Sequence, residues 1–146
     1  MGTWADVRAL ALGMPGAVED ATGATTAWRV GSRAFAWERI LRPGELGLRP
    51  DCPPGEPVLG LRVPDAAARA AWLAELPQAF FLVPHYEPYP MVLVDVRHAP
   101  FEALDEAVTE AWLSRAPQRA VRAYLAADLP SAPASSPGRQ VRPPVT

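Results

Sequence analysis

The stretch TAWRVGSRAFAWERIL (residues 26–41) decides the fold class of this chain. Two runs rich in aromatic and β-branched residues flank Gly31-Ser32, and a glycine followed by a small polar residue favours a two-residue type II′ turn. The sequence therefore predicts an antiparallel hairpin with strands over 26–30 and 33–41. In a regular register, with Val30 opposite Arg33 and Trp28 opposite Phe35, one face carries five side chains: Thr26, Trp28, Val30, Phe35 and Trp37.

Hydrophobic periodicity predicts the remaining elements. Four segments have apolar residues at helical spacing between capping residues, glycines or prolines: 3–14, 65–76, 101–115 and 117–127. Three further apolar runs of strand length follow the hairpin: 58–63, 80–83 and 91–96. Residues 16–25 and 42–57 are expected to be connections. The fold class is therefore predicted to be α+β, an antiparallel sheet with helices packed on one face.

Two of these helices show a predicted buried face. In the segment 101–115 the apolar stripe consists of Leu104, Ala107, Val108, Ala111 and Trp112. In the segment 65–76, with Asp65 as the expected N-cap, the inner face is predicted as Ala66, Ala70, Leu73 and Leu76. The four carboxylates on the opposite side of helix 101–115 are expected to form an ordinary solvated face.

A change of composition divides the chain into residues 1–127, one expected domain, and residues 128–146, a tail rich in proline and serine. Such a tail buries too little apolar surface to offset its ordering entropy, so we expect it to be disordered. Residues 1–128 hold 12 arginines and 16 acidic residues, a formal net charge of −4. A mildly acidic domain lacks the broad positive surface of a strong nucleic-acid binder.

The chain carries no signal-like N-terminus and no apolar run of the roughly 20 residues that a membrane helix needs. A cytoplasmic location is therefore the expectation, with no membrane partner. The oligomeric state is left open by the sequence.

Motifs for catalysis, metals and cofactors are missing. Cys52 stands alone in a proline-rich loop, which rules out an intramolecular disulfide. His85 has no carboxylate or histidine three or four positions further on, and His98 has only Glu102, too few ligands for a metal site. Neither Gly-x-Gly-x-x-Gly nor Gly-x-x-x-x-Gly-Lys, the glycine-rich phosphate-binding motifs, occurs. We therefore expect a domain that is not an enzyme and that has no metal site and no cofactor.

Two groups of arginines are candidates for binding phosphates. The alternative for each group is that its arginines are solvated and that some of them pair with neighbouring acidic side chains. The group on or beside the hairpin is Arg29, Arg33 and Arg39. The group where the last two predicted helices meet is Arg115, Arg119 and Arg122, which would align if helical geometry continued across the junction.

The segment His85-Tyr86-Glu87-Pro88-Tyr89-Pro90 is the other candidate binding element. Its side chains combine apolar bodies with polar tips, and its prolines make it stiff. Such a segment either covers the edge of a sheet or lines a pocket. A ligand pocket here would be lined by His85, Tyr86 and Tyr89.

The order of these elements resembles the MmcQ/YjbR-like family over most of residues 4–126. Three stretches carry the resemblance: WRVGSRAFA (28–36), FFLVPHYEPYPMVLV (80–94) and EAWLSRAPQR (110–119). The Pro-His-Tyr-x-x-Tyr-Pro segment is its most specific part. The resemblance implies a fold related to the frataxin-like CyaY architecture, and it implies DNA binding, the label commonly given to the family.

Two hypotheses follow. In the first, the chain binds DNA, with the hairpin as a wing and the two arginine groups on phosphates. In the second, it is a small-molecule or protein-interaction domain with a pocket near 85–90. An enzyme built from residues without a recognisable motif is a remote third possibility.

Overall fold

The computed structural model describes residues 2–47 and 53–128. The chain divides into two units, one ending at Ala116 and the other beginning at Pro117, and each is described by itself. The loop cysteine Cys52 and the predicted tail beyond Asp128 lie outside the described residues.

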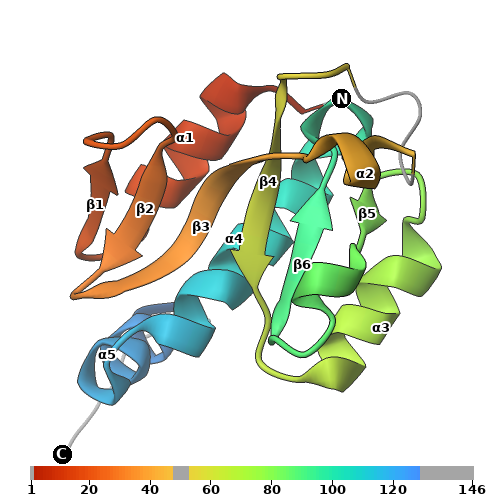
Figure 1. Cartoon of the computed structure of the whole chain (residues 1–146). Helices are drawn as coiled ribbons and strands as arrows, with labels where there is room; N and C mark the ends of the chain where they lie inside the picture. Colours follow the sequence, from red (N-terminus) through yellow and green to blue (C-terminus); the bar gives the residue numbers. More distant parts are fainter. Residues whose placement is uncertain (1, 48–52, 129–146) are drawn as a thin grey trace, which may run out of the picture. The chain divides into compact units, whose positions relative to one another are not determined.

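The described part of the first unit forms a six-stranded antiparallel sheet with the order β1-β2-β3-β4-β6-β5 (Figure 1). The strands are β1 (Ala17–Asp20), β2 (Ala27–Val30), β3 (Arg33–Ile40), β4 (Pro57–Arg62), β5 (Phe80–Phe81) and β6 (Met91–Val94). This arrangement confirms the α+β fold class. The hairpin is confirmed as well, and Gly31 between its strands has the positive φ of 61° that a type II′ turn requires at that position.

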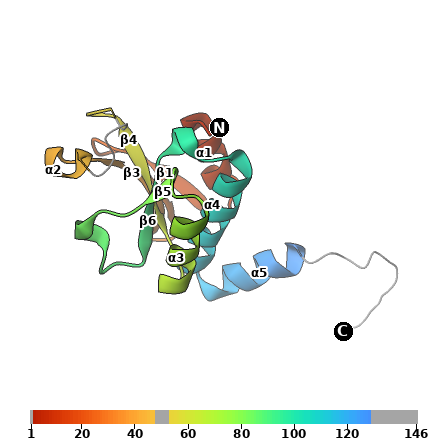
Figure 2. The same cartoon turned by 90° about the vertical axis from the view of Figure 1, so that its right-hand side faces the viewer.

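Three helices cover one face of the sheet, as Figure 2 shows: α1 (Trp4–Leu12), α3 (Ala66–Glu75) and α4 (Phe101–Arg115). The other face carries two short elements, α2 (Pro43–Leu46) and the 3-10 turn η1 (Pro84–Tyr86). A second 3-10 turn, η2 (Val96–His98), leads from β6 towards α4. In the described residues, no helix is long and apolar enough to cross a membrane.

The helix face of the sheet holds the main core. The predicted stripe of α4 is buried throughout, from Leu104 to Trp112, so that prediction is confirmed. Helix α1 begins where predicted, because the Thr3 hydroxyl accepts a hydrogen bond from the Asp6 amide at 3.1 Å and the Asp6 carboxylate accepts one from Thr3.

The predicted register of the hairpin is wrong beyond Arg29. Val30 does pair with Arg33, but Trp28 pairs with Ala36 because a β-bulge adds Phe35 to β3. An extra residue reverses the faces of every side chain beyond it. Trp28 is therefore buried on the helix face, and Trp37 lies on the opposite face of the sheet.

Two smaller predictions are also wrong. Residues 17–20, expected to be part of a connection, form the edge strand β1, which pairs with β2. In α3 the buried side chain is Trp72, whereas Ala66 and Ala70 are exposed. The Trp72 ring stacks on Phe80 with 4.5 Å between centroids, and its indole donates to Glu110 at 2.9 Å. Burying that ring sets the rotation of the helix.

A second, smaller apolar cluster lies on the other face of the sheet. Its buried members are Leu41, Val58, Phe81, Val83, Met91 and Leu93. Four partly buried side chains pack against it: Trp37, Leu46, Leu82 and Tyr86. This cluster supports the segment 84–90 and forms the base of the site described next.

The second unit contains the helix α5 (Gln118–Asp128), close to the predicted 117–127. Helical geometry stops before it, because Ala116 has φ −66° and ψ 150°, an extended conformation. The predicted alignment of Arg115 with Arg119 and Arg122 required a continuous helical turn across the junction. That turn is interrupted at Ala116.

Candidate functional site

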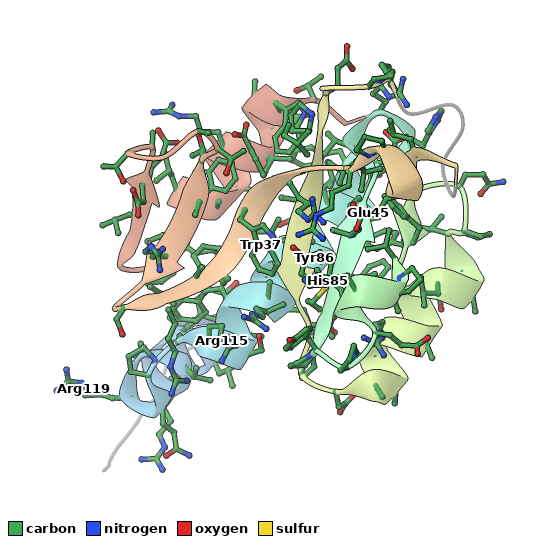
Figure 3. All side chains as sticks on the ribbon, in the orientation of Figure 1. Trp37, Glu45, His85, Tyr86, Arg115 and Arg119 are labelled. Carbon is green, nitrogen blue, oxygen red and sulfur yellow. The ribbon has the colours of Figure 1, made fainter. Side chains whose placement is uncertain are left out.

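A pocket of about 190 Å³ opens on the sheet face that carries η1. Six side chains from strands β3, β4 and β6 and from the segment 84–90 line it: Trp37, Arg62, His85, Tyr86, Tyr89 and Met91. In Figure 3 the labelled side chains Trp37, His85 and Tyr86 gather over this face, in front of β4 and β6. The structure thus places His85, Tyr86 and Tyr89 around one pocket, and their contact with a ligand stays a prediction.

The position of the Trp37 ring depends on a glycine in the neighbouring strand. Trp37 pairs with Gly60, so both residues face the pocket side of the sheet. A Cβ atom on residue 60 would lie only 2.3 Å from Trp37 Cε2, a distance at which one of the two must move. Because Gly60 has no side chain, the indole lies directly against the β4 backbone.

Three rings stand together on the 84–90 side of the pocket. His85 meets Tyr86 edge-on with 4.9 Å between centroids, and Tyr89 lies 6.4 Å from each of them. Met91, at the start of β6, is buried below them. The pocket is therefore aromatic on two sides and apolar at its base.

The tip of Tyr86 is fixed by Arg39 of β3. The Arg39 Nε donates to the Tyr86 hydroxyl at 2.8 Å, and its guanidinium carbon lies 5.2 Å from the Tyr86 ring centroid. The same guanidinium donates to both carboxylate oxygens of Glu45 in α2, each at 3.0 Å, and to the carbonyl of Ile40. With only 13% and 12% of their side chains exposed, Arg39 and Glu45 hold Tyr86 in place.

The other end of the segment is held from α3. The Arg69 guanidinium donates to the carbonyls of Tyr89 at 2.7 Å and of Glu87 at 3.0 Å. Turns within the segment add backbone bonds, among them Tyr89 N–H to the Tyr86 carbonyl at 2.9 Å. The backbone of the segment is therefore held at both ends, which limits the positions that its side chains can take.

Arg62 is the charged residue of the pocket lining. Its guanidinium carbon lies 5.3 Å from the Trp37 ring centroid, a cation–π distance. Its Nε atom is buried, and no acceptor among the described residues lies within hydrogen-bond distance of it. Burial lowers the pKa of Arg62, the positive charge of Arg115 lowers it further, and Tyr86 acts in the opposite direction. Among the described residues, the pocket lining thus carries this one arginine and no carboxylate.

The arginines of the hairpin do not form one cationic surface. Arg29 pairs with Asp20 at 3.2 Å, and Arg39 is committed to Glu45. Arg33 is exposed beside the hairpin turn, and strand alternation places it on the opposite face from Arg29. Of the second group, Arg115 belongs to the first unit, while Arg119 and Arg122 belong to the second.

Sequence reasoning missed three residues of the pocket: Trp37, Arg62 and Met91. Trp37 was assigned to the wrong face because the bulge at Phe35 has no local signal. Arg62 carries a usable signal, since it is the only charged residue in the apolar strand β4. Knowing which residue pairs with it, Met91, requires the long-range register between β4 and β6.

Among residues 2–47 and 53–128, no three His, Cys, Asp or Glu side chains come close enough together to hold an ion. Among the described residues, the acid–base side chains of the pocket lining are His85, Tyr86 and Tyr89, and the lining has no carboxylate, serine, threonine or cysteine.

Comparisons with known proteins place the chain among uncharacterised relatives. No family model matches its sequence. The solved structure of Deinococcus radiodurans protein DR2400, a domain of family DUF419, is similar with a TM-score of 0.57 and 22% identity, covering 77% of this chain and 78% of the other. DUF419 is the MmcQ/YjbR family, and the similarity supports the predicted α+β fold class.

Sequence similarity is higher to two mycobacterial proteins. The uncharacterised proteins Rv2570 of Mycobacterium tuberculosis and Mb2600 of Mycobacterium bovis are each 39% identical to this chain over 129 residues, which cover 86% of this chain and 98% of theirs. The chain therefore belongs to the same family as these two mycobacterial proteins.

Proposed function

We propose that this chain is a non-enzymatic binding domain whose site is the pocket lined by Trp37, Arg62, His85, Tyr86, Tyr89 and Met91. The observation that carries the proposal is the fixed ring arrangement. Arg39 and Glu45 hold the segment 84–90 at one end and Arg69 holds it at the other, and Gly60 leaves room for Trp37. These fixed contacts around an open pocket support a preformed binding site.

The size of the pocket narrows the ligand. A cavity of about 150 Å³ holds one benzene molecule, and drug-sized ligands occupy about 300 Å³ or more. At about 190 Å³, this pocket suits a small molecule with a single ring, or one side chain of a partner protein.

A screen of single-ring compounds, neutral and charged, tests the proposal by thermal shift of the full chain. We expect at least one compound to raise the melting temperature, and Tyr89→Ala to abolish that rise. Half of Tyr89 is exposed, so its removal spares the fold. Phe101→Ala, an exposed aromatic on α4, is the matched control. If no compound stabilises the protein, or if Phe101→Ala has the larger effect, the proposal is wrong.

DNA binding, through the family likeness, is the second candidate. The exposed Arg33 beside the hairpin turn supports it, and the pairing of Arg29 and Arg39 with carboxylates weighs against it. Fluorescence anisotropy with labelled duplex DNA at low salt would show binding in the micromolar range that falls steeply with added salt and weakens in Arg33→Ala. Absence of binding under these conditions would remove this candidate.

A further inference from the structure

We propose that the ligand of the pocket is a small organic anion whose acidic group pairs with Arg62 and whose planar apolar part lies between Trp37 and the tyrosines. This inference rests on the proposed function, that the pocket binds a small molecule, and adds the charge and shape of that molecule. The acidic group is a carboxylate or a phosphate, because both accept hydrogen bonds from a guanidinium in the same planar geometry.

Arg62 has unmet hydrogen-bonding capacity. Its Nε is buried and has no acceptor among the described residues, although buried polar groups in folded proteins are nearly always paired. Arg39, on the neighbouring strand, shows the ordinary solution, since it binds the Glu45 carboxylate. A bound anion would pair with the terminal N–H groups of the Arg62 guanidinium, as the Glu45 carboxylate pairs with Nη2 of Arg39.

The charge around Arg62 favours an anionic ligand. Arg115, at the end of α4, adds a second positive charge near it, and burial and Arg115 together lower the Arg62 pKa. The pocket lining of the described chain has no carboxylate to offset these charges. An anionic ligand is therefore attracted to the pocket, whereas an ammonium group is repelled.

The walls of the pocket favour a planar ligand. The Arg62 guanidinium already lies over the Trp37 ring, so an acidic group in line with the guanidinium would bring an attached ring alongside the aromatic side chains. Ring stacking and the volume of about 190 Å³ favour one planar ring over a flexible chain. Benzoate and phenyl phosphate are the simplest molecules with this chemistry.

Isothermal titration calorimetry of the full chain separates the possibilities with five probes. Benzoate and phenyl phosphate test the two acidic groups, benzamide is the neutral isostere of benzoate, benzylamine reverses the charge, and inorganic phosphate lacks the ring. We expect the tighter-binding aryl anion to have a dissociation constant at least about tenfold lower than that of benzamide. This is the ratio expected for one charge-assisted hydrogen bond. Benzylamine and inorganic phosphate should bind more weakly still.

Variants then assign the effect to one side chain. Arg62→Met should lower the affinity for the aryl anion about tenfold and leave benzamide binding unchanged, while Arg62→Lys should keep part of the preference for the anion. Arg33→Met removes an arginine outside the pocket and should change nothing. The comparison of probes on the wild-type chain needs no variant, so it decides the question even if Arg62→Met does not fold.

The outcomes separate the two proposals. If benzamide binds as well as the aryl anions, or if Arg62→Met binds them as well as the wild type, the inference about the anion is overturned and the pocket proposal stands. If inorganic phosphate binds as tightly as phenyl phosphate, the planar part of the inference is overturned. If none of the five probes binds, the anion inference fails, and an empty screen of neutral rings would then remove the proposed function as well.

Discussion

The Trp37 indole occupies the space that a side chain at Gly60 would need, since a Cβ there would lie 2.3 Å from Trp37 Cε2. The two residues pair across β3 and β4 on the pocket face. The glycine is thus a requirement of the site as well as of the sheet, because the ring can lie flat only where the opposing strand has no side chain.

Gly60→Ala should therefore weaken both ligand binding and the stability of the fold. The added methyl group must push the Trp37 ring away from β4, at a cost of about 1 to 3 kcal/mol in unfolding free energy, as for overpacked cores. Affinity for any pocket ligand should fall by more than tenfold. Urea unfolding and calorimetric titration measure the two effects, and unchanged affinity would mean that the ring position does not matter for binding.

Glu45→Gln should loosen Tyr86 through Arg39. The amide keeps the size of the side chain but removes the charge that Arg39 binds, and both groups are largely buried. We expect a loss of about 1 to 3 kcal/mol in stability, the range for a hydrogen bond to a charged group, together with weaker ligand binding. Asp20→Asn, which affects the exposed pair with Arg29, is the control and should leave ligand binding unchanged. Identical binding by both variants would show that the Glu45 charge does not position Tyr86 through Arg39.

The loss of folding stability at acid pH should depend on Asp95, which is 3% exposed. Burial raises the pKa of this carboxyl, but hydrogen bonds from Arg97 and the charges of Arg97 and His98 outweigh burial and hold the pKa below its ordinary value. A carboxyl with a lower pKa in the folded chain stabilises the fold above its unfolded pKa of about 4, and this stabilisation is lost as the pH falls through the folded pKa.

Asp95→Asn should therefore cost about 1 to 3 kcal/mol at pH 7 and less at pH 3. Urea unfolding of wild type and variant at both pH values measures this difference. Glu106→Gln, which changes an exposed carboxylate on α4, is the control. A penalty for Asp95→Asn of equal size at both pH values would show that the ionised carboxylate is not the source of the stability.

Local sequence signals predicted the elements better than the faces they present. Helix α4 has the predicted bounds because its apolar spacing continues from Leu104 to Trp112. The faces of the hairpin changed at Phe35, since a bulge inserts a residue without changing composition. In α3 the many alanines leave the helical stripe ambiguous, and contact with Phe80 selected the face that carries Trp72.

The candidate site was predicted only on its 84–90 side. His85, Tyr86 and Tyr89 lie within five consecutive residues, so one local stretch of prolines and aromatic residues was enough to indicate them. The opposite wall joins Trp37 and Arg62 through the pairing of β3 with β4, and that pairing depends on long-range register. Long-range register has no signature in a window of a few residues.

The indole N–H signals of the five tryptophans give the most direct test of the pocket as an anion site. In a ¹H–¹⁵N NMR titration with benzoate or phenyl phosphate, the Trp37 signal should shift and saturate. The signals of Trp72 and Trp112 should stay in place, because their indoles donate to Glu110 and to the Pro15 carbonyl on the helix side of the sheet. Arg62→Met should require about tenfold more ligand for the same Trp37 shift. A Trp37 signal that does not move with either anion, or that moves equally in Arg62→Met, would contradict the role of Arg62 in holding an anion in this pocket.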